Sequence, residues 1–186
     1  MPHRPGMRPL EEQVREALDA GITMLQLREK YLSEEDFLRE ALSIRKLTER
    51  YHVPLIINDS LYVAINSGAD GIHIGQSDLP AREVRAKLGP DKILGVTAKT
   101  VAQALEAEKA GADYLGSGAV FPSPTKTDAI PMSRETLTAI CQSVSIPVVA
   151  IGGINASNLS TLAGTGIAGA AIISGIFGQP DIGAAV

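Results

Sequence analysis

Cationic and polar side chains follow an apolar segment near the amino end of the sequence, in the order Gln26-Leu27-Arg28-Glu29-Lys30. In an extended chain, period-two alternation puts Gln26, Arg28 and Lys30 on one face. Two cations and an amide on one face can bind an anion such as a phosphate group. A lone Arg or Lys at a strand end is more often solvated charge, so the hypothesis depends on the strand ends that follow.

Two aspartates follow the next two apolar segments. Residues 54–57 run into Asn58-Asp59, and residues 71–74 run into a short polar loop that ends at Asp78. Two carboxylates near cations fit a magnesium ion whose shell is completed by diphosphate oxygens and water. Each aspartate can instead cap the helix after it. His73, on an apolar segment, is as consistent with a packed core residue as with a ligand.

Hydroxyls and glycines follow the later apolar segments. Thr97 ends one of them, and residues 121–128 combine two prolines, three hydroxyls and Lys126. Hydroxyls with a lysine suit a phosphate, although an ordinary surface turn has the same composition. Gly152-Gly153 and Ser174 follow the last two segments, where backbone N–H groups can approach an anion. We expect a bound phosphomonoester there.

These positions predict two anion sites. The first combines metal ligands and cations, and it comprises Gln26, Arg28, Lys30, Asn58, Asp59 and Asp78. The second is rich in backbone groups around Gly153 and Ser174, and residues 123–126 lie between the two. Joining a diphosphate-activated group to a phosphorylated acceptor would use both sites. The sequence has no Ser/His/Asp or Cys/His arrangement of the kind used in nucleophilic catalysis.

Amphipathic helical segments alternate with short Ile-, Val- and Leu-rich segments, which is typical of a parallel sheet buried on both faces. The pattern predicts helices over residues 8–20, 33–51, 60–67, 81–88, 100–110, 133–144 and 155–163, with Ser33 and Asp36 forming a capping box. It predicts strands over residues 23–28, 54–58, 71–74, 93–96, 114–118, 147–151 and 169–173. A G-x-G-x-x-G fingerprint after the first strand is absent, which favours a (β/α)8 barrel over an open nucleotide-binding sheet.

Composition limits the class of protein. The 186 residues predict a single barrel domain over residues 1–186, and 45% hydrophobic content is enough to build a core. A net charge of −4 without a basic run disfavours nucleic acid or an acidic membrane surface as partner. One cysteine excludes an internal disulfide, and the sequence has neither a signal segment nor an apolar run long enough to span a bilayer. We therefore expect a cytoplasmic protein.

The ordered set of motifs resembles the thiamine phosphate synthase family. The resemblance runs from about Leu10 to Gly178, and it rests on residues 26–30, 58–59, 73–78, 121–126, 151–154 and 173–174. It implies a (β/α)8 barrel and an enzyme, a transferase. The implied reaction couples 4-amino-2-methyl-5-(diphosphomethyl)pyrimidine to the phosphate of 4-methyl-5-(2-hydroxyethyl)thiazole with Mg2+, which gives thiamine phosphate and pyrophosphate.

The resemblance also implies a role for individual residues. Those that would hold the pyrimidine diphosphate are Gln26, Leu27, Arg28, Glu29, Lys30, Asn58, Thr97 and Lys126. Asp59 and Asp78 would bind Mg2+. Those that would hold the thiazole phosphate are Ser123, Pro124, Thr125, Gly153, Ile173 and Ser174. Arg28, Lys30 and Lys126 would act in catalysis by stabilising the departing pyrophosphate.

Both ends of the sequence depart from the family pattern. Residues 1–9 contain no apolar run for a first strand, and residues 179–186 are too few for a full final helix. We therefore expect a barrel whose first strand and last helix are missing or shortened. Exposed sheet edges can pair with another chain, which favours a possible homo-oligomer. The rival functions are a thiazole tautomerase, which would not need the pyrimidine-diphosphate set, and a non-catalytic thiamine phosphate-binding barrel.

Overall fold

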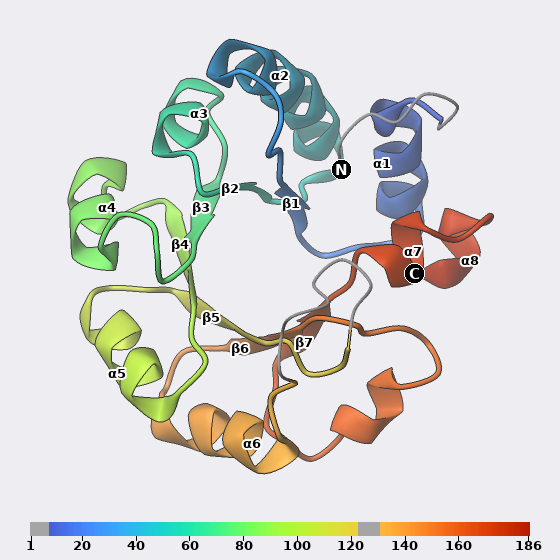
Figure 1. Cartoon of the computed structure of the whole chain (residues 1–186). Coiled ribbons are helices and arrows are strands. Elements are labelled where there is room, and N and C mark those ends of the chain that lie inside the picture. The colour runs from blue at the N-terminus through green and yellow to red at the C-terminus, as the bar shows by residue number, and fades with distance from the viewer. Residues whose placement is uncertain (1–7, 123–130) are drawn as a thin grey trace.

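A curved parallel sheet forms the interior of the computed structural model, which describes residues 8–122 and 131–186. In these residues seven strands lie side by side in chain order, from β1 to β7. The strands are β1 (Leu25–Leu27), β2 (Leu55–Asn58), β3 (Gly71–Ile74), β4 (Ile93–Thr97), β5 (Tyr114–Gly118), β6 (Val148–Ile151) and β7 (Gly169–Ala171). Figure 1 shows the strands around a common interior with the helices outside them. All neighbouring strands are parallel, so their carboxyl ends meet at one edge of the sheet.

Helices alternate with these strands. They are α1 (Leu10–Asp19), α2 (Glu34–Tyr51), α3 (Leu61–Asn66), α4 (Ala81–Leu88), α5 (Val101–Lys109) and α6 (Arg134–Ser143). The predicted capping box begins α2, where the hydroxyl of Ser33 accepts a bond from the backbone N–H of Asp36 at 3.1 Å. The same hydroxyl donates to the carboxylate of Asp36 at 2.8 Å. Predicted bounds agree with the structure for α4, β3 and β5, and most others differ by one or two residues.

The helix predicted over residues 155–163 is wrong for most of its length. Only Leu159–Leu162 is helical, as the 3-10 segment η1. The backbone N–H of Asn155 donates to the side-chain oxygen of Asn158, and the N–H of Ser157 donates to the side-chain oxygen of Asn155, each at 2.9 Å. The asparagine side chains here accept hydrogen bonds from backbone N–H groups, and these bonds compete with those of a regular helix.

The carboxyl end has the shortened final helix that the sequence indicates. One-turn helices α7 (Ser174–Phe177) and α8 (Ile182–Ala185) follow β7, which itself ends at Ala171 and not at residue 173. Ala17 of α1 forms a small buried cluster with Ile176 and Ile182. Figure 1 places α7 and α8 beside α1. The short final helical segment therefore packs against α1.

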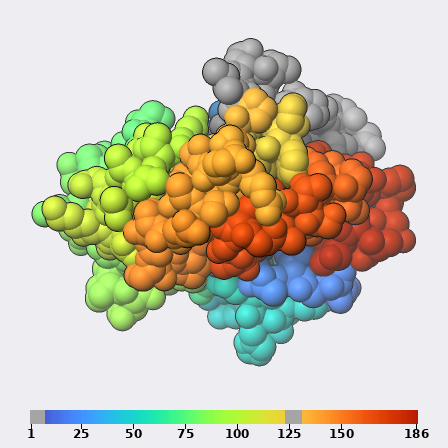
Figure 2. Space-filling view, turned by 90° about the horizontal axis from the view of Figure 1, so that it is seen from below, coloured from blue at the N-terminus to red at the C-terminus, as the bar shows by residue number. Residues whose placement is uncertain are grey.

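The core lies between the sheet and the surrounding helices. Every residue of β2 and β3 is buried, as expected for parallel strands covered on both faces. In β1 the buried Leu25 and Leu27 flank the exposed Gln26, which confirms the predicted alternation. Figure 2 shows the molecule from the side where α5 (yellow-green) and α6 (orange) form the outer surface.

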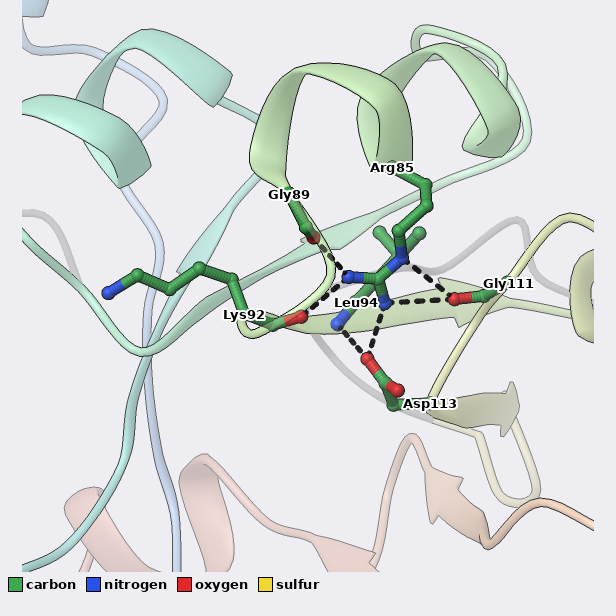
Figure 3. Close-up of polar contacts among 6 residues, drawn as sticks. All are labelled: Arg85, Gly89, Lys92, Leu94, Gly111 and Asp113. Carbon is green, nitrogen blue, oxygen red and sulfur yellow. Dashed lines mark hydrogen bonds and ion pairs between the residues drawn. The ribbon is translucent and has the colours of Figure 1, made fainter.

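Arg85 of α4 ties three segments together at the amino end of β4 (Figure 3). Its guanidinium donates to the carbonyl oxygens of Gly89, Lys92 and Gly111 at 2.7–3.1 Å. It also pairs with Asp113 at 2.5 Å, and the same carboxylate oxygen accepts the backbone N–H of Leu94 at 2.7 Å. A planar group with five N–H donors suits this set of carbonyls and carboxylate.

Candidate active site

Two carboxylates meet at the carboxyl edge of the sheet. Asp59 directly follows β2, and Asp78 lies in the loop between β3 and α4. Their side chains share a hydrogen bond, and burial together with the charge of Asp78 raises the pKa of Asp59. Neither aspartate caps a helix, because Ser60 and Pro80 hold the N-cap positions of α3 and α4. The helix-capping alternative is therefore wrong, and the two carboxylates face each other.

The backbone around Asp59 holds this arrangement. Its φ of 64° lies in the left-handed region, which an Asp tolerates better than most residues. Its N–H donates to the carbonyl oxygen of His73 at 2.9 Å, which joins the end of β2 to β3. The backbone N–H of Gly75 donates to Asp78 at 2.6 Å. Main-chain groups at the carboxyl end of β3 therefore hold the backbone of Asp59 and the carboxylate of Asp78.

Positive charge and an amide lie beside the pair. The charge of Arg28 and a hydrogen bond from the side chain of Asn58 both lower the pKa of Asp59, against the larger effects of burial and Asp78. Two facing carboxylates repel each other, and a divalent cation between them would relieve that repulsion. The donor set thus fits Mg2+. Within residues 8–122 and 131–186 no group of three or more His, Cys, Asp and Glu side chains forms a fuller metal site, so phosphate oxygens and water would complete the shell.

A second group of polar side chains lies in the interior between β1, β3, β4 and β5. The two ring nitrogens of His73 lie 2.9 Å from the hydroxyls of Tyr114 and Thr97. The side chain of Gln26 hydrogen-bonds to Tyr114. Burial lowers the pKa of His73 to about 4, only partly opposed by the charge of Asp78, so the ring is neutral near pH 7. His73 is therefore a packed, hydrogen-bonded core residue.

Leu27, Glu29 and Lys30 of the first motif differ in their surroundings. Leu27 is only 3% exposed in the core, so only its main chain can face a ligand. Glu29 lies near Glu40 of α2, whose pKa is raised by burial and by the charge of Glu29. Lys30 is exposed beyond the end of β1. The sequence motif therefore divides between the site, the core and the surface.

The predicted thiazole phosphate residues that can be placed lie after β6 and β7. Gly153 has a φ of 66°, and a side-chain carbon there would lie 2.5 Å from the carbonyl oxygen of Pro122. A side-chain carbon at Gly175 would lie 2.7 Å from the carbonyl oxygen of Ile154, so the loop after β6 contacts α7. Ile173 and Ser174, where α7 begins, are both exposed. Glycine is needed at both close approaches, and backbone and hydroxyl groups remain accessible nearby.

Four predicted site residues cannot be placed. Ser123, Pro124, Thr125 and Lys126 lie outside the described residues. The residues before them reach the glycine loop, because the N–H of Phe121 donates to the carbonyl oxygen of Gly152 at 3.1 Å. Their roles stay predictions.

Sequence reasoning missed Tyr114 as part of this region. It lies at the amino end of β5, whereas the search for chemistry followed the carboxyl ends of strands. Knowledge of the strand register would have identified it, since Gly95 of β4 pairs with both His73 and Tyr114. A glycine between two large polar residues marks space into which their rings can extend.

Comparisons with known proteins point to one family. A family model described as thiamine monophosphate synthase matches residues 2–176. The thiamine-phosphate synthase of Ruminiclostridium cellulolyticum is 55% identical over 173 residues, which cover 93% of this chain and 82% of that protein. Thiamine-phosphate synthase 2 of Streptococcus pneumoniae serotype 4 is 51% identical over 170 residues, which cover 91% of this chain and 81% of that protein.

A solved structure agrees with the sequence relatives. The thiamine phosphate pyrophosphorylase of Pyrococcus furiosus superposes with a TM-score of 0.88 at 40% identity, covering 96% of this chain and 86% of that one. Parallel strands in chain order around one interior, with helices outside, define a (β/α)-barrel protein, and the expected fold is confirmed, with seven strands in the described residues. The chain belongs to the thiamine monophosphate synthase family.

Proposed function

We propose that this chain catalyses the formation of thiamine phosphate and pyrophosphate from a pyrimidine methyl diphosphate and a thiazole phosphate. The observation that carries the proposal is the carboxylate pair of Asp59 and Asp78, which lies beside Arg28 at the carboxyl edge of the sheet. Relatives that are 51% and 55% identical to this chain are named thiamine-phosphate synthases, which supports a transferase that acts on small molecules.

The reaction depends on stabilising the charge of the leaving diphosphate and on positioning the two substrates. The bond between the pyrimidine methylene carbon and the diphosphate oxygen breaks, and the bond from the thiazole nitrogen to the same carbon forms. Arg28, with Lys30 and Lys126 as further cations, neutralises the charge that develops on the leaving diphosphate. Asp59 and Asp78 would hold Mg2+, which supplies additional positive charge at the diphosphate when it is bound.

The second substrate needs a fixed position more than it needs activation. Its ring nitrogen is already a nucleophile, so no general base is required. Gly153 and the main chain at Ile173 and Ser174 would hold its phosphate, and the nitrogen would then face the methylene carbon. Holding both reactants together converts a bimolecular step into one within the complex.

The domain organisation and the cellular location are part of the same proposal. We infer one domain that acts in the cytoplasm on its two small substrates. In the part of the chain that the structure describes, helices are too short or too polar to cross a membrane.

The test is a coupled assay of pyrophosphate release with both substrates and Mg2+. We expect turnover by the wild-type protein, loss of turnover in excess chelator, and a decrease of roughly 100-fold or more in Asp78→Asn. Asp91→Asn is the matched control, because Asp91 is exposed just before β4 at the opposite edge of the sheet. Full activity in excess chelator would refute the metal assignment. Binding of thiamine phosphate without turnover would favour the non-catalytic barrel, and activity that does not need the diphosphate substrate would favour the tautomerase.

A further inference from the structure

A chain of hydrogen bonds runs through the interior from β1 to the carboxyl end of β4. Tyr114 and His73 are 8% and 6% exposed, so the middle of this chain is buried. The Tyr114 hydroxyl lies 2.9 Å from Nδ1 of His73, and Nε2 of His73 lies 2.9 Å from the hydroxyl of Thr97. Gln26 bonds to Tyr114 at one end of the chain. Thr97, at the other end, is only half-buried.

Two glycines make the space for the two rings. A side-chain carbon at Gly95 would lie 2.2 Å from Cζ of Tyr114, and one at Gly116 would lie 2.8 Å from Cε1 of His73. Gly95 pairs with His73 on one side and Tyr114 on the other, while Gly116 pairs with Thr97. The rings therefore extend over the missing side chains and meet with centroids 5.4 Å apart. The strand register places this contact, and larger residues would prevent it.

The chain of bonds has a direction. A neutral histidine ring has one nitrogen that donates and one that accepts, so only two arrangements of protons are possible. In one of them Nε2 of His73 accepts the proton of Thr97, and the threonine hydroxyl then has no proton left to donate to an anion. In the other, Tyr114 donates its proton to Nδ1 of His73, and Nε2–H donates to the oxygen of Thr97. Only the second arrangement leaves the Thr97 proton available to an anion.

We propose that His73, held by Tyr114, is a positioning residue that fixes the Thr97 hydroxyl as a hydrogen-bond donor toward the diphosphate of the pyrimidine substrate. Nε2–H of His73 occupies the oxygen of Thr97 as an acceptor, so the proton of Thr97 is directed away from His73. The side chain of Gln76 also donates to the carbonyl oxygen of Thr97 at 2.5 Å and holds its main chain. That the acceptor is the diphosphate rests on the proposed function.

The first test needs no substrate. Nitrogen-15 NMR of the histidine rings distinguishes the two neutral tautomers, and His73 is assigned by the signals that disappear in His73→Gln. We expect His73 of the free protein near pH 7 to carry its proton on Nε2, and Tyr114→Phe to weaken that preference. A proton on Nδ1 in the wild-type protein would overturn the proposed direction of the chain.

The second test uses kinetics. Tyr114→Phe removes one hydroxyl, and we expect kcat/KM for the pyrimidine diphosphate to fall on the order of tenfold, while KM for the thiazole phosphate stays within about twofold. Thr97→Ser keeps the hydroxyl and retains activity, whereas Thr97→Val loses at least as much as Tyr114→Phe. Tyr62→Phe, in an exposed tyrosine of α3, is the matched control.

The double variant decides whether the residues act as a unit. Tyr114→Phe combined with Thr97→Val should be no slower than Thr97→Val alone, because the tyrosine acts only through the threonine. Losses that multiply would refute the proposed role of His73. A wild-type protein that releases no pyrophosphate would refute the proposed function and the identity of the acceptor, while the NMR measurement would still decide the direction of the hydrogen bonds.

Discussion

Replacement of Arg85 tests how much the contacts in Figure 3 contribute to stability. Arg85→Met keeps the length of the side chain but removes its bonds to three carbonyl groups and to Asp113. Neutral hydrogen bonds contribute about 1 kcal/mol each and charged ones about 1.5–3 kcal/mol, but water replaces part of them because the site is not fully buried. The Arg85 side chain is 19% exposed. We expect a net loss of about 3 kcal/mol, which lowers the melting temperature by about 6–12 °C.

Urea and thermal unfolding followed by circular dichroism measure this loss. Arg82→Met is the matched control, because Arg82 is exposed on the same helix and its replacement should change stability by less than about 0.5 kcal/mol. Arg85→Lys should fall between the two, since an ammonium keeps the charge near Asp113 but lacks the planar fork of donors. A loss below about 1 kcal/mol in Arg85→Met, or equal losses in the two methionine variants, would refute the argument.

Three further predictions concern the interior and the carboxylate pair. His73 has a pKa of about 4 in the folded protein, against an ordinary value of 6.5. As pH falls, the unfolded chain therefore binds the proton first, and stability that is present above pH 6.5 is lost toward pH 4. Urea unfolding should show about 2 kcal/mol of that loss between pH 7.5 and pH 5, and His73→Gln should lack it. Gly95→Ala should cost about 1–3 kcal/mol or more by displacing the Tyr114 ring, whereas Gly169→Ala, with open space around it, should not; equal melting temperatures would contradict this. Asp59→Asn should melt no lower than the wild type in excess chelator because it removes a charge that Asp78 repels, yet its melting temperature should no longer rise with Mg2+.

The sequence predicted best those elements whose apolar pattern results from burial alone. The apolar segments of β3 and β5 are buried as parallel strands and have the bounds that the pattern indicates. The prediction of a helix over residues 155–163 was wrong because asparagine side chains there accept hydrogen bonds from the backbone. Apolar periodicity carries no information about such bonds, which compete with those of the helix.

The candidate site divides in the same way. Placing Asp59 and Asp78 together required only that parallel strands end at one edge of the sheet, which the order of strands supplies. The contact between Tyr114 and His73 depends on which residues of adjacent strands are opposite each other, and so on the register around Gly95. Register is a tertiary property that a single sequence specifies weakly when both faces of a strand are buried.

Strands that neighbour one another in space also neighbour one another in the sequence, from β1 to β7. During synthesis each emerging strand can therefore add to a partner that is already present, so the sheet can grow from its amino end as the ribosome proceeds. The contact between α1 and α8 is different, because it joins the beginning and the end of the described chain. It can form only when translation has passed residue 185, which is after every strand of the described sheet has been synthesised.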